Sequence, residues 1–262
     1  MSLAEWSDRI LPEHDVAPWW PAVEPTPRWI RVRVGGELIA DSRRALLLLQ
    51  YRGPRQLPTY YVPLDDVTTD ALVDRRDDEG HLARWTVQAG DQRLVDAAWM
   101  HTQPDDVHAS LADHVTFSWD AVDWYEEDEL LIAHARDPHK RVDTAHSSRH
   151  VQVEIAGELV ADTVGPVLLF ETLLPTRFYL PPADVRTDVL EPSGTVSLCP
   201  YKGRARYWSV RVGDTLASDV VWSYPRPVAE NPRIAGMLSF FNERVDIIVD
   251  GERQPRPRTP WS

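Results

Sequence analysis

An internal duplication constrains the fold of this chain more than any other feature of its 262-residue sequence. The segment Val32–Asp41 recurs as Val153–Asp162, and Trp85–Asp91 recurs as Trp208–Asp214, at offsets of 121 and 123 residues. The further matches, in the same order along the chain, are Leu57–Val67 with Leu174–Val185, Trp99 with Trp222, and Phe117 with Phe240. Because the offset drifts by only a few residues, as loop insertions would produce, we interpret the chain as two copies of one unit of roughly 110 residues.

The residue pattern within each copy is that of β-strands. Val151, Val153 and Ile155 alternate with polar residues, which places apolar side chains on one face of an extended segment. Chain reversals are expected at Gly35-Gly36 and at Ala156-Gly157, and the 22 prolines and 12 glycines suit many short strands with frequent turns. We therefore predict an all-β fold of two tandem, small, twisted antiparallel-sheet domains with matching strand orders, packed on each other as an internal pseudo-dimer.

Composition divides the chain further. Trp19 and Trp20 lie in a segment without periodicity, and we expect them to cover the contact between the two copies. The expected segments are an N-terminal arm rich in Pro and Trp at 1–28, a diverged first repeat at 29–133, a polar linker at 134–149, a second repeat at 150–251 and a tail rich in Pro and Arg at 252–262.

Charge is unevenly distributed between the copies. Residues 1–148 hold 27 acidic residues against 15 Lys and Arg, whereas residues 149–262 hold 14 against 13. The net charge of −13 argues against nucleic acid as a partner, and the acidic runs of the first half are typical of a solvated surface. No apolar run is long enough for a membrane helix, and the acidic N-terminus lacks a signal region, which favours a cytoplasmic location.

Two residue types are rare. Cys199 is the only cysteine, which excludes an internal disulfide and a multi-cysteine zinc site, and no metal or cofactor is expected. There are only two lysines against 26 arginines, and one of them, Lys202, follows Cys199 by three residues.

The second half carries a set of motifs found together in one family. These motifs are Gly157–Asp162, Phe170-Glu171, Tyr179–Pro181, Asp184-Val185, Cys199–Gly203, Tyr207-Trp208, Trp222–Pro225 and Val249–Gly251. In them the chain resembles domain of unknown function 427, a bacterial and fungal family that is sometimes labelled nucleotidyltransferase-like. The resemblance implies a fold of the β-tent group, several members of which bind ligands in aromatic cages. The zinc cysteines of much of that group are absent here.

Nucleotidyl transfer, which the family label implies, lacks support in the residues. Such enzymes usually present a Gly-Ser turn followed by paired aspartates that hold two magnesium ions. The chain contains no Gly-Ser dipeptide and no Gly-rich phosphate loop.

The first copy departs from the second at one motif. Aligned through Trp85 and Trp208, the Cys199–Lys202 segment is replaced by Arg76–Glu79, and only Gly80 matches Gly203. We therefore place the candidate site in the second copy alone.

The candidate site combines a nucleophile, charged groups and aromatic rings. Gly203 allows a tight turn, so Lys202 is expected to point inward, with its ammonium close to the Cys199 sulfur or to Glu171. A nearby ammonium favours the reactive thiolate of a cysteine, which makes Cys199 and Lys202 the candidate catalytic residues. The candidate ligand-binding residues are Glu171, Arg177, Tyr179, Tyr201, Tyr207, Trp208, Trp222 and Tyr224. Buried core roles are the alternative for Cys199 and for the aromatic residues, Trp208 above all.

Two classes of function remain open. One is a β-domain that binds a small planar or anionic molecule in the second repeat, with catalysis left undecided. The other is a non-catalytic interaction module in which the acidic first repeat binds a protein partner. A pocket at Glu171, Tyr179, Lys202 and Trp222 would favour the first class, and a filled core there with an exposed apolar patch on the first repeat would favour the second.

Overall fold

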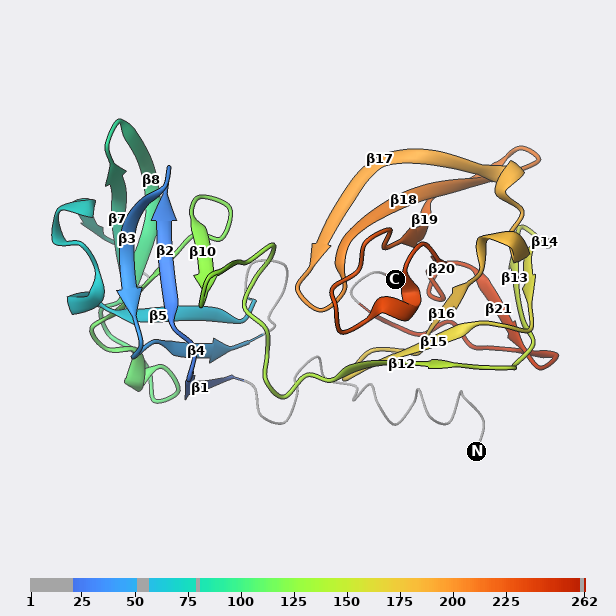
Figure 1. Cartoon of the computed structure of the whole chain (residues 1–262), viewed down its shortest axis with the longest axis horizontal. Coiled ribbons are helices and arrows are strands. Elements are labelled where there is room, and N and C mark those ends of the chain that lie inside the picture. Colours follow the sequence, from blue (N-terminus) through green and yellow to red (C-terminus); the bar gives the residue numbers. More distant parts are fainter. Residues whose placement is uncertain (1–20, 51–56, 79–80, 260–261) are drawn as a thin grey trace. The chain divides into compact units, whose positions relative to one another are not determined.

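Both repeats fold into antiparallel β-sheets. A computed structural model describes residues 21–50, 57–78, 81–259 and 262 (Figure 1). The described residues form two compact units, and along the chain the boundary between them falls between Asp137 and Pro138. No helix in these described ranges is long and apolar enough to cross a membrane.

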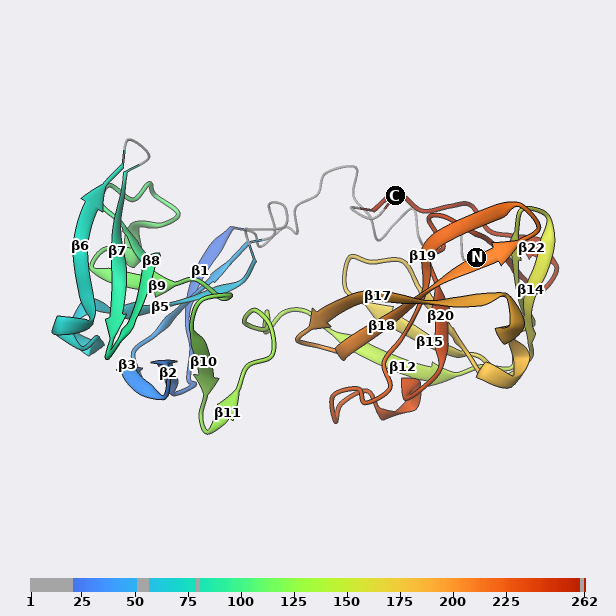
Figure 2. The ribbon, with the colours of Figure 1, turned by 90° about the horizontal axis from the view of Figure 1, so that it is seen from above.

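The first repeat contains a seven-stranded sheet and a four-stranded sheet. The larger sheet has the order β1-β4-β5-β9-β8-β7-β6, and β6, β7 and β8 lie side by side in Figure 2. Its strands are β1 (Ala22–Pro25), β4 (Leu46–Leu49), β5 (Thr59–Pro63), β6 (Leu72–Asp77), β7 (Leu82–Ala89), β8 (Gln92–His101) and β9 (His114–Phe117). The smaller sheet, in the order β11-β10-β2-β3, consists of β2 (Ile30–Val34), β3 (Glu37–Ser42), β10 (Asp123–Glu126) and β11 (Glu129–Leu130).

The second repeat has the same architecture. Its larger sheet has the order β12-β15-β16-β20-β19-β18-β17 and its smaller sheet the order β14-β13-β21-β22. The larger sheet is built from β12 (Val142–His146), β15 (Val167–Glu171), β16 (Arg177–Leu180), β17 (Leu190–Cys199), β18 (Gly203–Val212), β19 (Thr215–Ser223) and β20 (Leu238–Phe240). The smaller sheet is built from β13 (Val151–Ile155), β14 (Glu158–Thr163), β21 (Asp246–Val249) and β22 (Glu252–Arg253). The matching orders confirm the duplication.

Helical structure in the described residues is confined to single turns. The 3₁₀ turns are η1 (Leu64–Asp66), η2 (Thr69–Ala71), η3 (Ala109–Leu111), η4 (Pro182–Asp184), η5 (Thr187–Val189) and η6 (Pro232–Ile234). The all-β prediction is therefore confirmed.

The predicted hairpins lie where the turn residues placed them. Gly35 and Gly36 connect β2 to β3 with φ of +57° and +89°, and Ala156 and Gly157 connect β13 to β14 with φ of +52° and +80°. Two successive positive φ angles match the right-handed twist of paired strands, which is why glycine is favoured in such turns.

The duplication extends to individual side-chain contacts. Trp29 Nε1 donates a hydrogen bond to Asp41 Oδ1 at 2.6 Å, and at the equivalent place His150 Nε2 lies 2.7 Å from Asp162 Oδ1. Asp41 and Asp162 occupy the same position of the repeated Gly-Glu-Leu-x-Ala-Asp segment. Each aspartate thus contacts the residue that immediately precedes the neighbouring strand of the small sheet in its own repeat.

Strand alternation gives each seven-stranded sheet two different faces. In the second repeat, Leu168, Phe178 and Leu180 pack with residues of the four-stranded sheet in the main core. Val167, Leu169 and Tyr179 alternate with them and form a separate cluster with Trp222 and others. We call the face that carries this second cluster, directed away from the four-stranded sheet, the outer face.

Three expected boundaries need correction. β1 lies within the expected arm and pairs with β4, and β12 lies within the expected linker and pairs with β15, so each repeat begins one strand earlier than expected. Both are edge strands, which tolerate the proline and polar residues that hid them in the sequence. The expected tail begins with β22, and Thr259 Oγ1 donates to Glu243 at 2.6 Å. The pseudo-dimer contact stays a prediction, and Trp19 and Trp20 lie outside the described residues.

Candidate functional site

Glu171 lies at the centre of an ionic cluster on the outer face of the second repeat. Its side chain, at the end of β15, is 4% exposed, and one carboxylate oxygen accepts a hydrogen bond from Lys202 Nζ. The other carboxylate oxygen lies 2.9 Å from Lys140 Nζ. The sequence predicted that Lys202 would approach either the Cys199 sulfur or Glu171, and the contact seen is with Glu171, whereas the contribution of Lys140 was not predicted. We call Lys140, Glu171 and Lys202 the lysine–glutamate cluster.

Charge outweighs burial in the titration of this cluster. Burial opposes ionisation of the Glu171 carboxylate, but the neighbouring Lys202 and Lys140 ammonium groups prevail and hold its pKa at about 2. Burial likewise disfavours the Lys202 cation, yet Glu171 and the adjacent Cys199, Tyr224 and Tyr179 raise its pKa well above the ordinary value. Both partners are therefore charged at neutral pH.

The turn from β17 to β18 brings Lys202 to this place. Lys202 N donates to Cys199 O at 3.3 Å, and Gly203 adopts φ of +107°. A Cβ atom on Gly203 would lie 3.1 Å from Arg226 O, so the close approach of the 225–228 backbone also requires glycine. Val228 N donates to Lys202 O at 3.2 Å, which holds the turn against this segment.

The aromatic residues expected at the site form a packed layer beside the lysine–glutamate cluster. Tyr179, Trp222 and Tyr224 are 0%, 6% and 5% exposed and share one apolar cluster, against which Cys199 packs half-buried. Trp222 Nε1 donates to Tyr179 OH at 3.1 Å, and burial raises the pKa of Tyr179 to about 12. The sequence predicted these rings as walls of a ligand pocket, and in the structure they lie buried against one another beside the cluster.

Tyr201 and Tyr207 flank the same region. The Tyr201 ring centroid lies 5.3 Å from Lys140 Nζ, within cation–π range, and Asn231 Nδ2 fixes its backbone by donating to Tyr201 O at 2.9 Å. Tyr207 is half-buried, stacks on Phe241 at a centroid distance of 6.5 Å and shares a hydrogen bond of 2.7 Å with Ser197 Oγ.

Trp208 does not belong to the site. It pairs with Val221 across β18 and β19, whereas Tyr207 pairs with Trp222, so the two side chains at 207 and 208 point to opposite faces. Trp208 packs against the main core of the repeat. The alternative core role considered for Trp208 is the one the structure supports.

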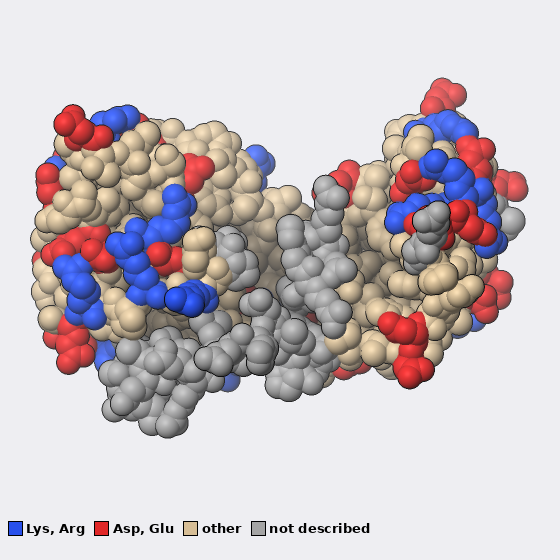
Figure 3. Space-filling view, turned by 180° about the vertical axis from the view of Figure 1, so that it is seen from behind, with Lys and Arg blue, Asp and Glu red and all other residues tan. Residues whose placement is uncertain are grey.

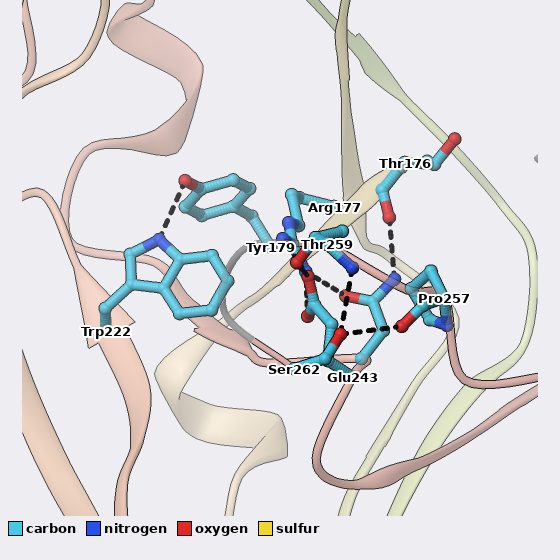
Figure 4. Close-up of polar contacts among 9 residues, drawn as sticks. Thr176, Arg177, Tyr179, Trp222, Glu243, Pro257, Thr259 and Ser262 are labelled. Atoms are coloured by element: carbon cyan, nitrogen blue, oxygen red, sulfur yellow. Dashed lines mark hydrogen bonds and ion pairs between the residues drawn. The ribbon is translucent and has the colours of Figure 1, made fainter. Parts of the chain in front are cut away.

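Arg177 forms a second buried ion pair on the outer face, shown in Figure 4. Its guanidinium donates to both carboxylate oxygens of Glu243 at 2.6 Å and to Asn242 Oδ1 at 2.9 Å. Its Cζ atom also lies 5.5 Å from the Trp222 ring centroid. The donors of Arg177 are directed at Glu243 and Asn242, so Arg177 is not placed to bind a ligand. It packs beside Trp222 instead.

Some of these residues carried a signal in the sequence and others did not. Lys140 is the second of the chain's two lysines, so the rarity that marked Lys202 marks Lys140 equally. Glu243 and Asn242 stand in no motif, and only the fold brings them to Arg177.

The equivalent surface of the first repeat is apolar and aromatic. Leu48, Tyr61 and Leu111 form its outer-face cluster, and Tyr61 OH lies 3.4 Å from His101 Nε2. The sequence equivalent of Glu171 is Gln50, and the equivalent of Lys202, Glu79, lies outside the described residues. No group of three or more His, Cys, Asp or Glu side chains in the described part of the chain could hold a metal ion.

Comparison with known proteins identifies the repeated unit. A search of the curated proteins finds no match to this chain. The profile of the family described as domain of unknown function (DUF427) matches twice, at residues 22–128 and 143–251. These ranges include β1 and all of β12 except Val142, so both matches begin at these edge strands. The chain therefore belongs to the DUF427 family, of which it carries two tandem copies.

Proposed function

We propose that the second repeat binds a small anionic molecule at the lysine–glutamate cluster, with the Cys199 thiol beside it as candidate nucleophile. One observation carries this proposal: the only two lysines among 28 cationic Lys and Arg residues converge on one buried carboxylate. An ammonium is a compact charge with three donors, suited to a small site in which its position matters. Among the described residues, most arginines are exposed and only Arg177 is buried.

Stability of the fold does not account for the cluster. Burying ionised groups costs hydration free energy that their mutual attraction repays only in part, and well-packed apolar residues at such positions are often as stable. The first repeat has the same strand order with Leu48, Tyr61 and Leu111 on its outer face. The architecture is therefore compatible with an apolar cluster, which favours a functional reason for the charges.

The geometry suits an anionic ligand. The side chains of Lys140 and Lys202 are 12% and 13% exposed, so both are at the edge of the buried region while Glu171 lies below them. A carboxylate or phosphate of a ligand would accept hydrogen bonds from these ammonium groups, and the Tyr201 ring beside Lys140 would contact a planar ligand. Cys199 lies near enough to Lys202 to raise the pKa of the Lys202 ammonium.

Calorimetric titration with benzoate and with inorganic phosphate tests this proposal. We expect at least one of these anions to bind the wild-type chain, and Lys202→Met to weaken binding by about tenfold or more, as loss of one charge-assisted hydrogen bond implies. The double variant Lys202→Met/Glu171→Gln removes one positive and one negative charge together. It therefore tests whether weaker binding by Lys202→Met comes from a folding defect. Glu79→Met, at the equivalent sequence position of the first repeat, is the matched control.

Alkylation of Cys199 supplies a second readout. Displacement of iodide from iodoacetamide by the thiolate sulfur should be several-fold slower in Lys202→Met than in the wild type, because the nearby cation is gone. Equal binding of both anions by wild type and Lys202→Met, together with equal alkylation rates, would contradict the proposal.

The buried packing of Tyr179 and Trp222 is the filled core that would favour the interaction-module alternative, but an exposed apolar patch confined to the first repeat does not accompany it. Large exposed apolar side chains occur on both repeats, for example Val95 at 66% and Val164 at 67% exposure. Acidic and basic side chains are interspersed on the face of the first repeat visible in Figure 3. Several acidic residues of the first repeat are paired with arginines, as Asp96 is with Arg76. A protein partner of the acidic first repeat therefore stays an alternative, and no nucleotidyl transfer is proposed.

A further inference from the structure

The two seven-stranded sheets end in edge strands of different character. In the first repeat, β6 carries Asp74, Arg75, Arg76 and Asp77, and charged residues are a common protection of sheet edges against pairing with other chains. In the second repeat, the segment from Pro192 to Cys199 of β17 contains no charged residue. Figure 1 shows β17 as the outermost strand of its sheet. The second repeat thus presents an edge without this protection.

Apolar side chains project from the regular part of this edge. Val196 and Leu198 are 44% and 52% exposed, and they stand opposite Arg206 and Arg204 on β18. Since directly opposed residues share a face, these four side chains form one exposed patch, which we call the edge patch. Ala205, between the two arginines, points to the outer face, so the edge patch lies on the opposite face from the lysine–glutamate cluster.

The arginines of the edge patch are unusual in having no partner. In the described part of the chain, the side chains of Arg204 and Arg206 form no ion pair, hydrogen bond or ring contact, and neither does the side chain of Arg226, whose backbone approaches Gly203. By contrast, Arg75 of the first-repeat edge lies 3.0 Å from Asp77, and Arg76 is paired with Asp96. Three uncompensated cations next to an unprotected edge indicate an anionic partner.

We propose that the edge patch binds an extended acidic peptide segment of a partner protein, which adds to β17 as a further strand. Backbone hydrogen bonds to the edge would supply affinity, and acidic side chains on one face of the added strand would contact Arg204 and Arg206 across Val196 and Leu198. Long arginine side chains can cover apolar neighbours while their guanidinium groups reach outward. This site is separate from the proposed anion site and does not depend on it.

Fluorescence anisotropy with a labelled octapeptide of alternating glutamate and valine tests the proposal on the full chain. We expect binding at low salt that weakens as salt screens the charges, and a loss of about tenfold or more in Arg204→Ala/Arg206→Ala. Arg75→Ala/Arg76→Ala removes the same number of cations from the equivalent edge and should leave the affinity within about twofold. All four positions are exposed, so the variants should fold, which circular dichroism would verify.

Backbone methylation separates strand addition from simple charge attraction. In an added strand, alternate N–H groups face β17, so a peptide N-methylated at one alternating set of residues should lose binding while one methylated at the other set keeps it. Equal binding of both methylated peptides would overturn strand addition. Equal losses in the two double-arginine variants would overturn the edge patch, and tighter binding of single-stranded RNA than of the peptide would overturn the partner class.

Discussion

The outer faces of the two repeats differ more than the strands that form them. In the first repeat, Leu48, Tyr61 and Leu111 pack as an apolar cluster. In the second repeat, the same face holds two ionic arrangements, one around Glu171 and one between Arg177 and Glu243. Since strand order and hairpins are shared, the difference shows that the sheet tolerates either solution and that ionic groups are not needed to form it.

The elements that the copies share indicate what the fold requires. In each repeat a tyrosine contacts a tryptophan: Tyr61 of β5 contacts Trp99, and Tyr179 of β16 contacts Trp222. Beside this retained pair, Gln50 and Thr59 of the first copy stand where the second copy has the charged Glu171 and Arg177. The buried ionic groups are therefore particular to the outer face of the second repeat, whereas the aromatic pair belongs to what both repeats share.

The largest expected effect concerns the Arg177–Glu243 pair. Arg177→Met leaves the Glu243 carboxylate, whose side chain is 0% exposed, without its bidentate partner. Removing one member of a buried ion pair costs about 3–5 kcal/mol in free energy of unfolding. Amide hydrogen exchange of β16 and β20, measured at increasing urea concentrations, would give the loss in free energy of unfolding of the second repeat.

Two further variants sharpen this comparison. Arg177→Met/Glu243→Leu should recover most of the lost stability, because it replaces the pair with apolar groups. Thr59→Val, at the equivalent place in the first repeat, should change stability by less than about 1 kcal/mol. A double variant as unstable as the single one would show that the second repeat needs the charges after all.

The next effect concerns Glu171 and depends on pH. Glu171→Gln removes the carboxylate that Lys140 and Lys202 share, and we expect a loss of about 2–3 kcal/mol at pH 7. The pKa of Glu171 is about 2 in the folded chain against an ordinary 4.5. The ionised group therefore stabilises the fold above pH 4.5, and this contribution is lost as the pH falls from 4.5 towards 2.

Urea titrations of wild type and Glu171→Gln at several pH values would check this expectation. The two curves should converge between pH 4.5 and 2. A difference that stays constant down to pH 2 would mean that the amide perturbs packing and that the ionic contacts contribute little.

Much of the fold could be predicted from the sequence because it rests on local chemistry. Glycine turns and alternating apolar residues specify hairpins within ten residues, and repetition of the pattern gives the duplication. The contact between Lys202 and Glu171 was one of the two predicted for Lys202, because Gly203 marks the turn that brings this lysine inward. Edge strands β1 and β12 were missed because a strand with one unpaired side can be short and polar.

The site was harder because long-range packing decides it. Lys140 reaches Glu171 only through the pairing of β12 with β15, which the sequence does not reveal. Trp208 and Trp222 look alike as candidates, yet the register of β18 and β19 turns one into the core and the other to the outer face. A shift of one residue in strand pairing moves a side chain to the opposite face of the sheet. β-bulges introduce such shifts, and the residue pattern does not mark them.

The smallest expected effect tests what the two repeats share. Burial holds the pKa of both Tyr61 and Tyr179 at about 12, against 10 for an exposed phenol. Each phenol stays protonated in the folded chain while it ionises in the unfolded chain above pH 10, so wild-type stability falls as the pH rises from 10 to 12.

Tyr61→Phe and Tyr179→Phe each remove one hydrogen bond to tryptophan and should cost about 1 kcal/mol at pH 7, and above pH 10 each should recover part of that loss. Absorbance at the phenolate band and urea unfolding would measure both effects. If the pair is a structural requirement of the repeat, the two variants should behave alike, whereas a much larger cost in Tyr179→Phe would tie that tyrosine to the neighbouring lysine–glutamate cluster instead.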